Sequence, residues 1–376
     1  MSFVRRICRA NVAAHDTRFN RAGTMIAFAI ATSMPMILIG FAAISGGAWG
    51  WLAVGYITIL VFVMDRLIAR PLENADPDAE FPGATPLLIG LGLGHFALLA
   101  LALWAVAGQT GLTPVEKALV AISSALVIGQ ISHPVAHELI HRPARTLRLV
   151  GRLIYTSILF GHHASAHLKV HHVHVASRSD PSSARIGEGF YRFVARAWPG
   201  EFRAGRQAES RFLAGRNGRI RRHPYTLYLG GAVVMLALSG LIFGGNGVAA
   251  LGFVAGYAQL QILMSDYVQH YGLRRTTRAD GRPEPVGPQH SWNAPHWASS
   301  AMTLNAPRHS DHHVRPARPY PALQLSGDTM PLLPYSLPVM AVLALVPPLW
   351  RRIMDPRAAR WRDQDTSGGT GHNLAV

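Results

Sequence analysis

Cysteine and charged residues are both scarce in this chain. Cys8 is the one cysteine among 376 residues, which excludes an intramolecular disulfide, a metal site built from cysteines and a fused Cys-x-x-Cys iron–sulfur module. Charged residues make up only 15% of the chain, against about a quarter in a typical soluble domain. Hydrophobic residues make up 49%, and the mean hydropathy is +0.17. This composition favours an integral membrane protein.

Acidic residues are fewer than basic ones, 20 against 36, which gives a formal net charge of +16. In a soluble protein this excess would suggest nucleic-acid binding, but the sequence has no recognition-helix or aromatic-platform signal. The arginines instead gather beside apolar segments, as in the cytoplasmic loops of membrane proteins. The N-terminus is basic (Arg5, Arg6, Arg9) and lacks a small-residue cleavage site, so we expect the first apolar segment to be a retained anchor.

Six apolar stretches are long enough to cross about 30 Å of hydrocarbon as helices. They lie near 24–45, 48–68, 86–108, 115–135, 225–245 and 247–267. Alternate connections are short and nearly uncharged, whereas the others carry the arginines. The positive-inside rule therefore places both termini and the long polar segments in the cytoplasm. We expect an all-α integral membrane protein with about six transmembrane helices, a single domain over 1–363 and a disordered tail over 364–376.

Two shorter apolar pieces remain, at 149–161 and 331–350. The second contains five prolines, which do not allow a regular spanning helix. We expect both pieces to lie against the membrane face or dip into it. Residues 274–290, rich in arginine, proline and glycine, are expected to form a cytosolic loop.

Histidines concentrate in four short segments of this apolar chain. The string 137-HELIH-141 follows the fourth apolar stretch and places two histidines on one helical face at positions i and i+4. The strings 167-HLKVHH-172 and 309-HSDHH-313 repeat this spacing with an added histidine, and one more histidine ends the sixth stretch. The candidate metal ligands are His137, His141, His167, His171, His172, His270, His309, His312 and His313.

Nine imidazoles exceed the three or four ligands that one zinc ion needs and fit two metal ions with open positions. Imidazole suits zinc, copper, iron or nickel. Neutral rings leave such a site cationic, so nearby carboxylates are expected to hold the other ring nitrogens. The candidates for this role are Glu138, Asp180, Asp266 and Asp311, although each could equally be a helix-capping or surface acid. The remaining histidines in these segments, His133, His162, His163 and His174, are expected to lie around the site or on the surface.

With these residues laid out, the chain resembles the integral-membrane non-haem diiron alkane 1-monooxygenases. That family belongs to a wider group with the xylene monooxygenases and the membrane fatty-acid desaturases. The matching strings are 137-HELIHR-142, 167-HLKVHHVHVAS-177 with 180-DPSSARIGE-188, 267-YVQHYGLRR-275 and 308-RHSDHHVRPARPYPAL-323. The Tyr-x-x-His-Tyr-Gly-Leu and Arg-His-Ser-Asp-His-His strings are similar to the alkane hydroxylase branch rather than to the desaturases.

The resemblance implies that the nine histidines bind two non-haem iron ions. It further implies hydroxylation of the terminal methyl group of alkanes with dioxygen, in a bacterial-type inner membrane. Two electrons would come from a rubredoxin or ferredoxin with its reductase, and the arginines Arg142, Arg145, Arg148, Arg152, Arg274 and Arg275 would attract an acidic carrier. Membrane topology alone explains these arginines equally well. Three positions beside the ligands depart from the family pattern: Ala166, Val170 and Gln269, where the family usually has Glu, Gly and Glu.

Several alternatives stay open. The same site could act on an aromatic methyl group, as in xylene, or hydroxylate or desaturate an acyl chain. A membrane zinc protease could use His137 and His141 as ligands and Glu138 as base, which would leave six clustered histidines unexplained. A metal carrier would place its ligands near mid-membrane, not outside the apolar stretches. Small residues in the third stretch (Gly90, Gly92, Gly94, Ala97) could form a substrate route or simply allow close helix packing.

Overall fold

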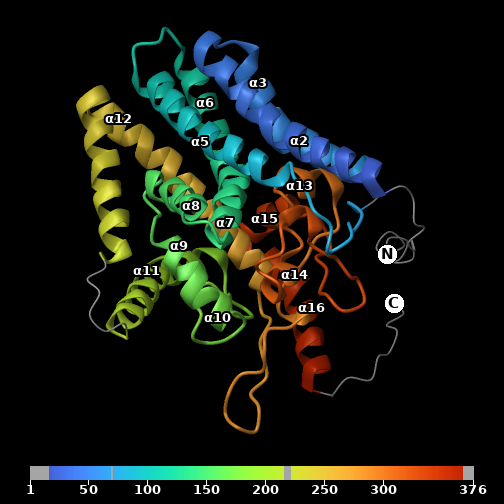
Figure 1. Cartoon of the computed structure of the whole chain (residues 1–376). Helices are drawn as coiled ribbons and strands as arrows, with labels where there is room; N and C mark the ends of the chain where they lie inside the picture. Colours follow the sequence, from blue (N-terminus) through green and yellow to red (C-terminus); the bar gives the residue numbers. More distant parts are fainter. Residues whose placement is uncertain (1–16, 69–70, 216–221, 367–376) are drawn as a thin grey trace.

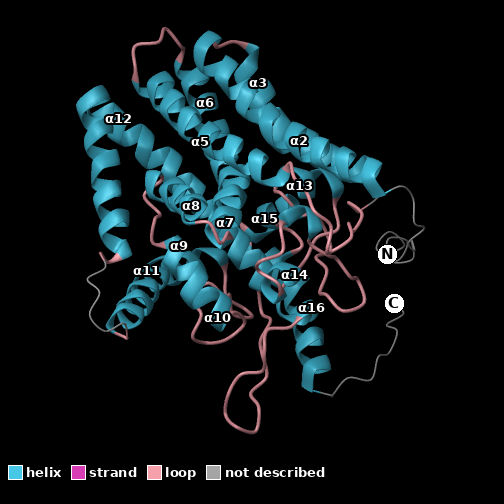
Figure 2. Ribbon diagram, viewed as in Figure 1, coloured by secondary structure: helices cyan, strands magenta, loops and turns pink. Residues whose placement is uncertain are grey.

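Helices make up nearly all of the regular structure. A computed structural model of the chain describes residues 17–68, 71–215 and 222–366 (Figure 1). Within these ranges there is no β-strand, only two isolated bridges, Thr277–Pro283 and Asn293–Leu332 (Figure 2). The prediction of an all-α protein is confirmed. The basic N-terminus and Cys8 lie outside the described residues.

The α-helices in chain order are α2 (Thr17–Ser45), α3 (Ala48–Gly55), α4 (Val61–Leu67), α5 (Ala84–Ala107), α6 (Pro114–Val127), α7 (His133–His141), α8 (Arg145–Ser157), α9 (His163–Ala166), α10 (His172–His174), α11 (Phe190–Ala214), α12 (Pro224–His270), α13 (Trp297–Met302), α14 (His309–Val314), α15 (Leu337–Ala344) and α16 (Pro347–Thr366). Three π-helical turns interrupt or join them: η1 (Tyr56–Leu60), η2 (Ile128–Ser132) and η3 (His167–His171). Two short 3₁₀ turns are η4 (Pro288–His290) and η5 (Tyr320–Ala322).

Five helical segments are long and apolar enough to cross a membrane. They are Ala22–Ser45, Ala48–Leu67, Ala84–Ala107, Pro114–His141 and Pro224–His270. The first four each match one predicted stretch, and the fifth covers the last two predicted stretches together. The locations of the predicted apolar helices are therefore confirmed, whereas the number of six crossings stays a prediction.

Helix α12 bends sharply at Gly244, so its 47 residues form two arms (Figure 1). Gly244 has φ 63° and ψ −153°, a backbone conformation that is essentially confined to glycine. A side chain at Gly247 would overlap the carbonyl oxygen of Ser239, so the second arm begins in close contact with the first. The bend falls in 244-GGNG-247, the short connection that separates the two predicted apolar stretches.

The helix that runs from Pro114 to His141 lies at the centre of the bundle. Thr113 caps its N-terminus by accepting a hydrogen bond from the Glu116 amide, and Pro114 occupies its first turn. Within its most apolar window 78% of residues are buried, against 44% or less in the other four segments. The string 137-HELIH-141 is the last turn of this helix, so the sequence brings these histidines into the interior of the protein.

The two shorter apolar pieces also form helices. Residues 149–161 contain most of α8, which packs its apolar face against α5, α7 and α12. Residues 331–350 divide between α15 and the start of α16, and a proline lies in the first turn of each helix, where it is tolerated. Their predicted position at the membrane face is still a prediction. Helix α16 extends to Thr366, three residues into the expected tail; the rest of that tail lies outside the described residues.

Replacing Gly244 with alanine should destabilise the protein, because alanine strains the backbone at this bend. We expect a cost of about 1–3 kcal/mol, seen as a fall of several degrees in the Tm of the detergent-purified protein. Gly245→Ala is the matched control, since Gly245 has no positive φ and no atom within 4 Å of an added Cβ. Equal Tm values for the two variants would show that the bend does not depend on Gly244.

Candidate metal centre

Five histidine rings from three segments meet at the end of α7. The Nε2 atoms of His137 and His167 are 2.8 Å apart, those of His167 and His172 2.9 Å, and those of His172 and His312 3.2 Å. His141 completes the set, and one nitrogen from each of the five rings lies within 4.8 Å of all the others. We call these residues the first histidine group.

Four further rings form a second histidine group beside the first: His171, His270, His309 and His313. The Nε2 atoms of His270 and His309 are 2.9 Å apart, and those of His309 and His313 are 3.1 Å apart. All four residues are buried, and their ligand atoms again lie within 4.8 Å of one another. The structure therefore brings together all nine histidines singled out in the sequence. Their role as ligands stays a prediction.

The histidines of the string 167-HLKVHH-172 are divided between the two groups, because part of this string is a π-helix. Residues 167–171 form a π-helix, in which hydrogen bonds join i and i+5 instead of i and i+4. His167 consequently meets His172 in the first group, whereas His171 lies in the second. The expectation that His167 and His171 act together as an i, i+4 pair is wrong for this reason.

Helix α14 also contributes to both groups. His309 and His313, four residues apart, share one face of this helix and lie in the second group. His312 projects from a neighbouring face into the first group, where its ring meets that of His172. One six-residue helix therefore joins the two groups.

The donor set fits metal ions in both groups. Two nitrogens at right angles on an ion, with bonds of about 2.1 Å, lie about 3.0 Å apart, close to the observed spacings. Five buried ring nitrogens in the groups have no hydrogen-bond partner among the described residues: Nε2 of His141 and His171, and Nδ1 of His270, His312 and His313. Burial, reinforced by neighbouring imidazoles, lowers the pKa of His167, His172, His309, His312 and His313 well below its usual range. These rings are therefore neutral, the form that binds metal.

Asp180 is the carboxylate that holds a ring of the two groups. Its Oδ2 lies 2.8 Å from His171 Nδ1 and accepts a hydrogen bond from Ser183 Oγ at 2.6 Å. Burial lowers the pKa of His171, but the charge and hydrogen bond of Asp180 more than offset this and raise the pKa to about 9, so an ion that binds Nε2 would have to displace its proton. The contact fixes Nδ1 towards the carboxylate and leaves Nε2 to face the second group, an arrangement common among metal-binding histidines.

Glu138 and Asp311 support the backbone around the site and do not contact the histidine rings. Glu138 Oε2 accepts hydrogen bonds from Arg142 at 3.0 Å and from the Tyr320 amide at 3.3 Å. Both oxygens of Asp311 pair with Arg318 Nη1, at 2.7 and 2.6 Å, and Oδ2 also accepts from the Gln324 amide. The prediction that these two acids orient ligand rings is not met. Glu138 instead fastens the segment after α14 to α7, and Asp311 fastens the same segment to α14 itself.

Asp266 belongs to a third cluster, with His163 and Glu201. Each of the three offers one atom within 4.8 Å of the others, so the cluster could hold a cation. His163 Nδ1 lies 2.9 Å from Glu201 Oε2, and Ser182 Oγ donates to Glu201 Oε1 at 2.8 Å. No hydrogen bond joins Asp266 to any of the nine rings in the described contacts. The predicted role of Asp266 in holding a ligand ring is therefore not seen.

The other three extra histidines lie around the two groups. His133 Nδ1 is 3.0 Å from the Tyr155 hydroxyl, and the His162 ring packs edge-on against Trp198 and Phe202. His174 is partly exposed and is not a member of any of the three clusters found in the described part of the chain.

Two buried acids of α11 secure the second histidine string, and neither was expected from the sequence. Glu201 binds His163, as described above, and Glu209 accepts hydrogen bonds from Ser165 at 2.8 Å and from Lys169 at 2.6 Å. Both acids are buried and lie eight positions apart on one face of α11, with Gly205 between them. That spacing on the buried face of an arginine-rich helix is the signal that could have identified them.

Gln269 stands where the family pattern usually has glutamate, and the structure gives a reason for this difference. Its amide Nε2 donates to the Ala306 carbonyl at 3.0 Å, and its Oε1 accepts from Ser265 Oγ at 2.8 Å. An ionised glutamate could make the second contact but not the first. Ala166 and Val170, the other two departures, are both buried beside the histidines.

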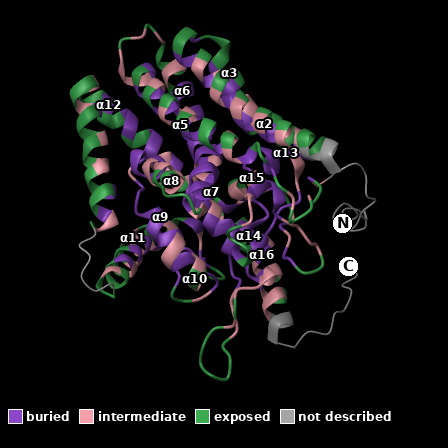
Figure 3. Ribbon diagram, viewed as in Figure 1, coloured by how far each residue is buried: buried purple, intermediate pink, exposed green. Residues whose placement is uncertain are grey.

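A small pocket lies between the two groups. His137 and His312 of the first group and His309 of the second line it. Apolar side chains complete the wall: Pro134, Leu304, Ala306 and Leu323, together with Glu138. The lining residues are buried apart from Ala306, which is half-buried, and Figure 3 shows that buried residues concentrate around α7 and α14. A small group that enters the pocket would contact rings of both groups.

Apolar helices that end in a buried, histidine-rich centre define an integral membrane protein with a metal site. The family model described as fatty acid desaturase matches residues 117–343. The chain is 32% identical over 329 residues to alkane 1-monooxygenase 2 of Pseudomonas aeruginosa. This alignment covers 82% of the chain and 84% of that protein. It is 30% identical over 318 residues to alkane 1-monooxygenase 2 of Alcanivorax borkumensis, with 82% of each chain covered.

A more distant similarity joins the chain to the hydroxylase component of the xylene/toluene monooxygenase of Pseudomonas putida, at 27% identity over 348 residues and 88% of each chain. The chain therefore belongs to the fatty acid desaturase family and, within it, groups with the alkane 1-monooxygenases. The resemblance described from the histidine strings is confirmed.

His312→Ala should remove an ion from the first histidine group, because the variant loses a ring nitrogen that faces His172. We expect the metal content of the purified protein, measured by mass spectrometry, to fall by about one ion per chain or more, because α14 joins the two groups. The control is His174→Ala, which removes an imidazole close by that belongs to no cluster. If both variants keep the metal content of the parent, His312 is not a ligand.

Gln269→Glu tests whether the hydrogen bond from Gln269 Nε2 to the Ala306 carbonyl explains the glutamine at this position. The carboxylate would face the Ala306 carbonyl without a hydrogen to donate, which costs about 1–3 kcal/mol for a buried pair. We expect a lower Tm for this variant, and a larger loss at pH 8 than near pH 5, because protonation of the introduced carboxylate restores a donor. A Tm equal to that of the parent at both pH values would contradict the described hydrogen bond.

Proposed function

We propose that the protein is a membrane-bound monooxygenase that hydroxylates the terminal methyl group of alkanes. The balanced reaction consumes one alkane, one dioxygen molecule, two electrons and two protons, and it yields a primary alcohol and one water. The observation that carries the proposal is the pair of histidine groups joined by η3 and α14, with an apolar pocket between them. The relatives named alkane 1-monooxygenase support it.

Two non-haem iron ions fit this centre best. Imidazole donors without thiolate suit iron, and five and four rings leave positions for dioxygen on ions that accept six ligands. Iron bound in both groups would supply the reduction of dioxygen and the oxidation of the C–H bond. The five rings of the first group and the four of the second would hold the ions, with Asp180 orienting His171.

The chain's own residues bind and position the substrate. Pro134, Leu304 and Leu323 give the pocket an apolar wall that excludes water and favours a hydrocarbon end. Pro134 lies in the apolar segment Pro114–His141, so a candidate membrane helix forms part of the pocket wall. Alkanes dissolve in the hydrocarbon of the bilayer, which is therefore the source of the proposed substrate.

The arginine-rich loops support a cytoplasmic position for the centre and for both termini, in a bacterial-type inner membrane. Electrons would come from a rubredoxin or ferredoxin with its reductase. The single domain over 1–363 remains part of the proposal.

The similarity to the xylene/toluene monooxygenase component favours one second candidate, hydroxylation of an aromatic methyl group. An acyl-chain hydroxylase or desaturase would use the same centre. A zinc protease is poorly supported, because Arg142 and the Tyr320 amide bind Glu138 and because His137 and His141 converge with three other histidines. A metal carrier is also poorly supported, because six of the nine rings come from segments outside the candidate membrane helices.

A product assay tests the proposed function. Membranes containing the protein would receive reduced rubredoxin and its reductase, or a ferredoxin-type donor, with n-octane, n-hexadecane or p-xylene. We expect a primary alcohol from an alkane, identified by gas chromatography, and about two irons per chain by metal analysis. Benzylic alcohol alone would move the substrate to the xylene class. One zinc per chain, with no alcohol from any substrate, would contradict the proposal.

A further inference from the structure

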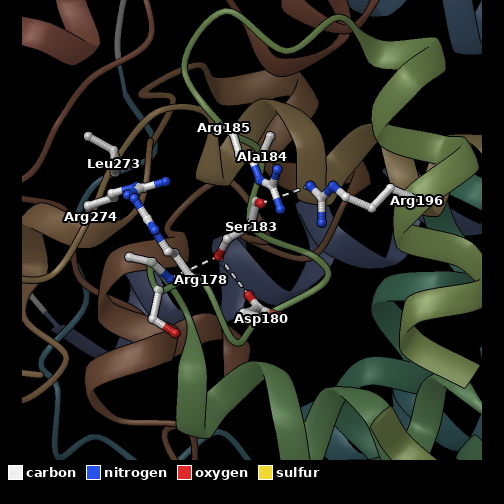
Figure 4. Close-up of a pocket in the computed structure, with 10 residues that line it drawn as sticks. Arg178, Asp180, Ser183, Ala184, Arg185, Arg196, Leu273 and Arg274 are labelled. Atoms are coloured by element: carbon white, nitrogen blue, oxygen red, sulfur yellow. Dashed lines mark hydrogen bonds between the residues drawn. The ribbon is translucent and has the colours of Figure 1, made fainter. Parts of the chain in front are cut away.

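A second pocket opens on the surface beside the second histidine group. Arg178, Arg185 and Arg274 surround it, and Asp180 and Ser183 lie at its inner end (Figure 4). Asp180 is buried, whereas Arg178 and Arg185 are exposed. We call this site the arginine pocket.

The arginine pocket carries more positive than negative charge, because four arginines and one acid line it. No ion pair joins the side chain of Arg178, Arg185 or Arg274 to an acid in the described part of the chain. Glu188 accepts a hydrogen bond of 2.9 Å from the Arg185 amide, but its side-chain ion pair is with Arg196, through two hydrogen bonds of 2.9 Å. Partial burial and repulsion from Arg178, Arg362 and Arg185 lower the pKa of Arg274. Binding of an anionic group would reduce the electrostatic repulsion among these arginines.

The pocket is held firmly at the end of α12. The backbone amide of Gly272 donates to the Ala184 carbonyl at 3.0 Å, and the amide of Arg275 donates to the Ala176 carbonyl at 2.9 Å. These bonds fasten the loop that contains Asp180 to the residues that directly follow His270. The arginines therefore stand in a fixed position relative to the second histidine group.

A short path joins the arginine pocket to that group. Asp180 at the inner end of the pocket lies 2.8 Å from His171 Nδ1, and the His171 ring belongs to the second group. One hydrogen bond thus separates the wall of the pocket from a candidate metal ligand. No comparable link to a histidine ring is seen for the arginines of α8 in the described contacts.

Other arginines near the centre are already engaged. Arg142 binds Glu138, and Arg148 donates to the carbonyls of Arg142 and Pro143. Arg275 donates to the carbonyls of Glu284 and Val173. Of the six arginines that the sequence suggested for carrier binding, Arg274 is the one that contributes to this unneutralised cluster.

We propose that the arginine pocket is the docking surface for an acidic electron-carrier protein, and that electrons enter the centre through Asp180 and His171. The inference rests on the proposed function, whose reaction needs two electrons from outside the chain. Two reduced carriers each give up one electron and leave oxidised, and the two electrons are consumed in the reduction of dioxygen. Acidic side chains of the carrier would replace water around Arg178, Arg185 and Arg274.

Binding of a reduced rubredoxin to the iron-loaded full chain in detergent tests the proposal without relying on turnover. The double variant Arg178→Glu, Arg274→Glu should raise the Kd at low salt by roughly tenfold or more. Arg145→Glu is the matched control, because Arg145 is an exposed arginine of α8 with no ion pair among the described residues. We expect less than about a twofold change for that control. Each replacement changes the net charge by two units, so the effect is compared per replaced arginine. An equal effect per replacement in the double variant and in the control would overturn the proposal, because it would reflect net charge alone.

Turnover provides the second readout. The KM for the carrier should rise in the double variant in parallel with the Kd, while the KM for the alkane stays at the parent value. Single-turnover alcohol formation with dithionite, which needs no docking, should be retained. Loss of this dithionite-driven product would show that the arginines support the centre itself and would overturn the proposal.

The outcomes also separate this inference from the proposed function. Weakened carrier binding in the double variant, with no alcohol from any substrate in the parent, would leave the docking surface standing and reject the proposed function. If the double variant is active and its KM for the carrier equals that of the parent, the proposed function stands and the docking surface is rejected. If phosphate or vesicles containing anionic lipid displace the carrier where chloride of equal ionic strength does not, the pocket is a phosphate-binding site, and the inference fails.

Discussion

Nine imidazoles converge in the interior, seven of them buried and two, His141 and His172, half-buried, and the rest of the structure depends on this constraint. Buried polar nitrogens need partners, so each neutral ring requires an acceptor for its N–H and a donor or a metal ion for its remaining lone pair. The rings come from four segments that are distant in the sequence. The most buried helix of the bundle supplies the first two, and the acids of α11 hold the next three in place. Arg308 anchors the last segment by donating to Asn74 Oδ1 and to the carbonyls of Leu72 and Leu323.

Apolar side chains occupy both the core and the surface of the protein. Serines, histidines and acids are buried beside the hydrophobic core, and many large aliphatic side chains point outwards. On the first arm of α12, Leu241 is 83% exposed, and Val233 and Ile242 are each 65% exposed. Figure 3 shows this exposed arm at the edge of the molecule. Hydrocarbon is the surrounding that makes such a surface stable, because it removes the cost of exposing these side chains.

The sequence predicts the existence of elements better than their detailed geometry. Long apolar runs depend only on composition, so the sequence locates the helices that carry them to within a few residues. The i, i+4 rule places His137 and His141 together, and His309 and His313 together, since both pairs lie on ordinary α-helix. It fails at His167, because a π-helical turn depends on packing against α11 and has no local signature. Glu201 and Glu209 escape prediction for a related reason: their partners are about 40 residues away in the sequence.

The acids near the centre illustrate the same limit. Proximity in sequence to a histidine suggested four carboxylates, but Asp180 is the one of these four that reaches a ring, and it does so across nine residues. Glu138, adjacent to His137 in the chain, points away towards Arg142 and Tyr320. Neighbouring side chains on a helix point in different directions, so an acid beside a ligand is poorly placed to hold that ligand.

Because η3 and α14 each contribute to both histidine groups, the geometry of one group constrains that of the other. An ion held in the first group would fix the backbone of α14 through His312 and thereby position His309 and His313. A second ion would then bind to rings that are already ordered, at a smaller loss of conformational entropy. We therefore expect occupancy of the two sites to be cooperative, with ions gained or lost as a pair more readily than one at a time.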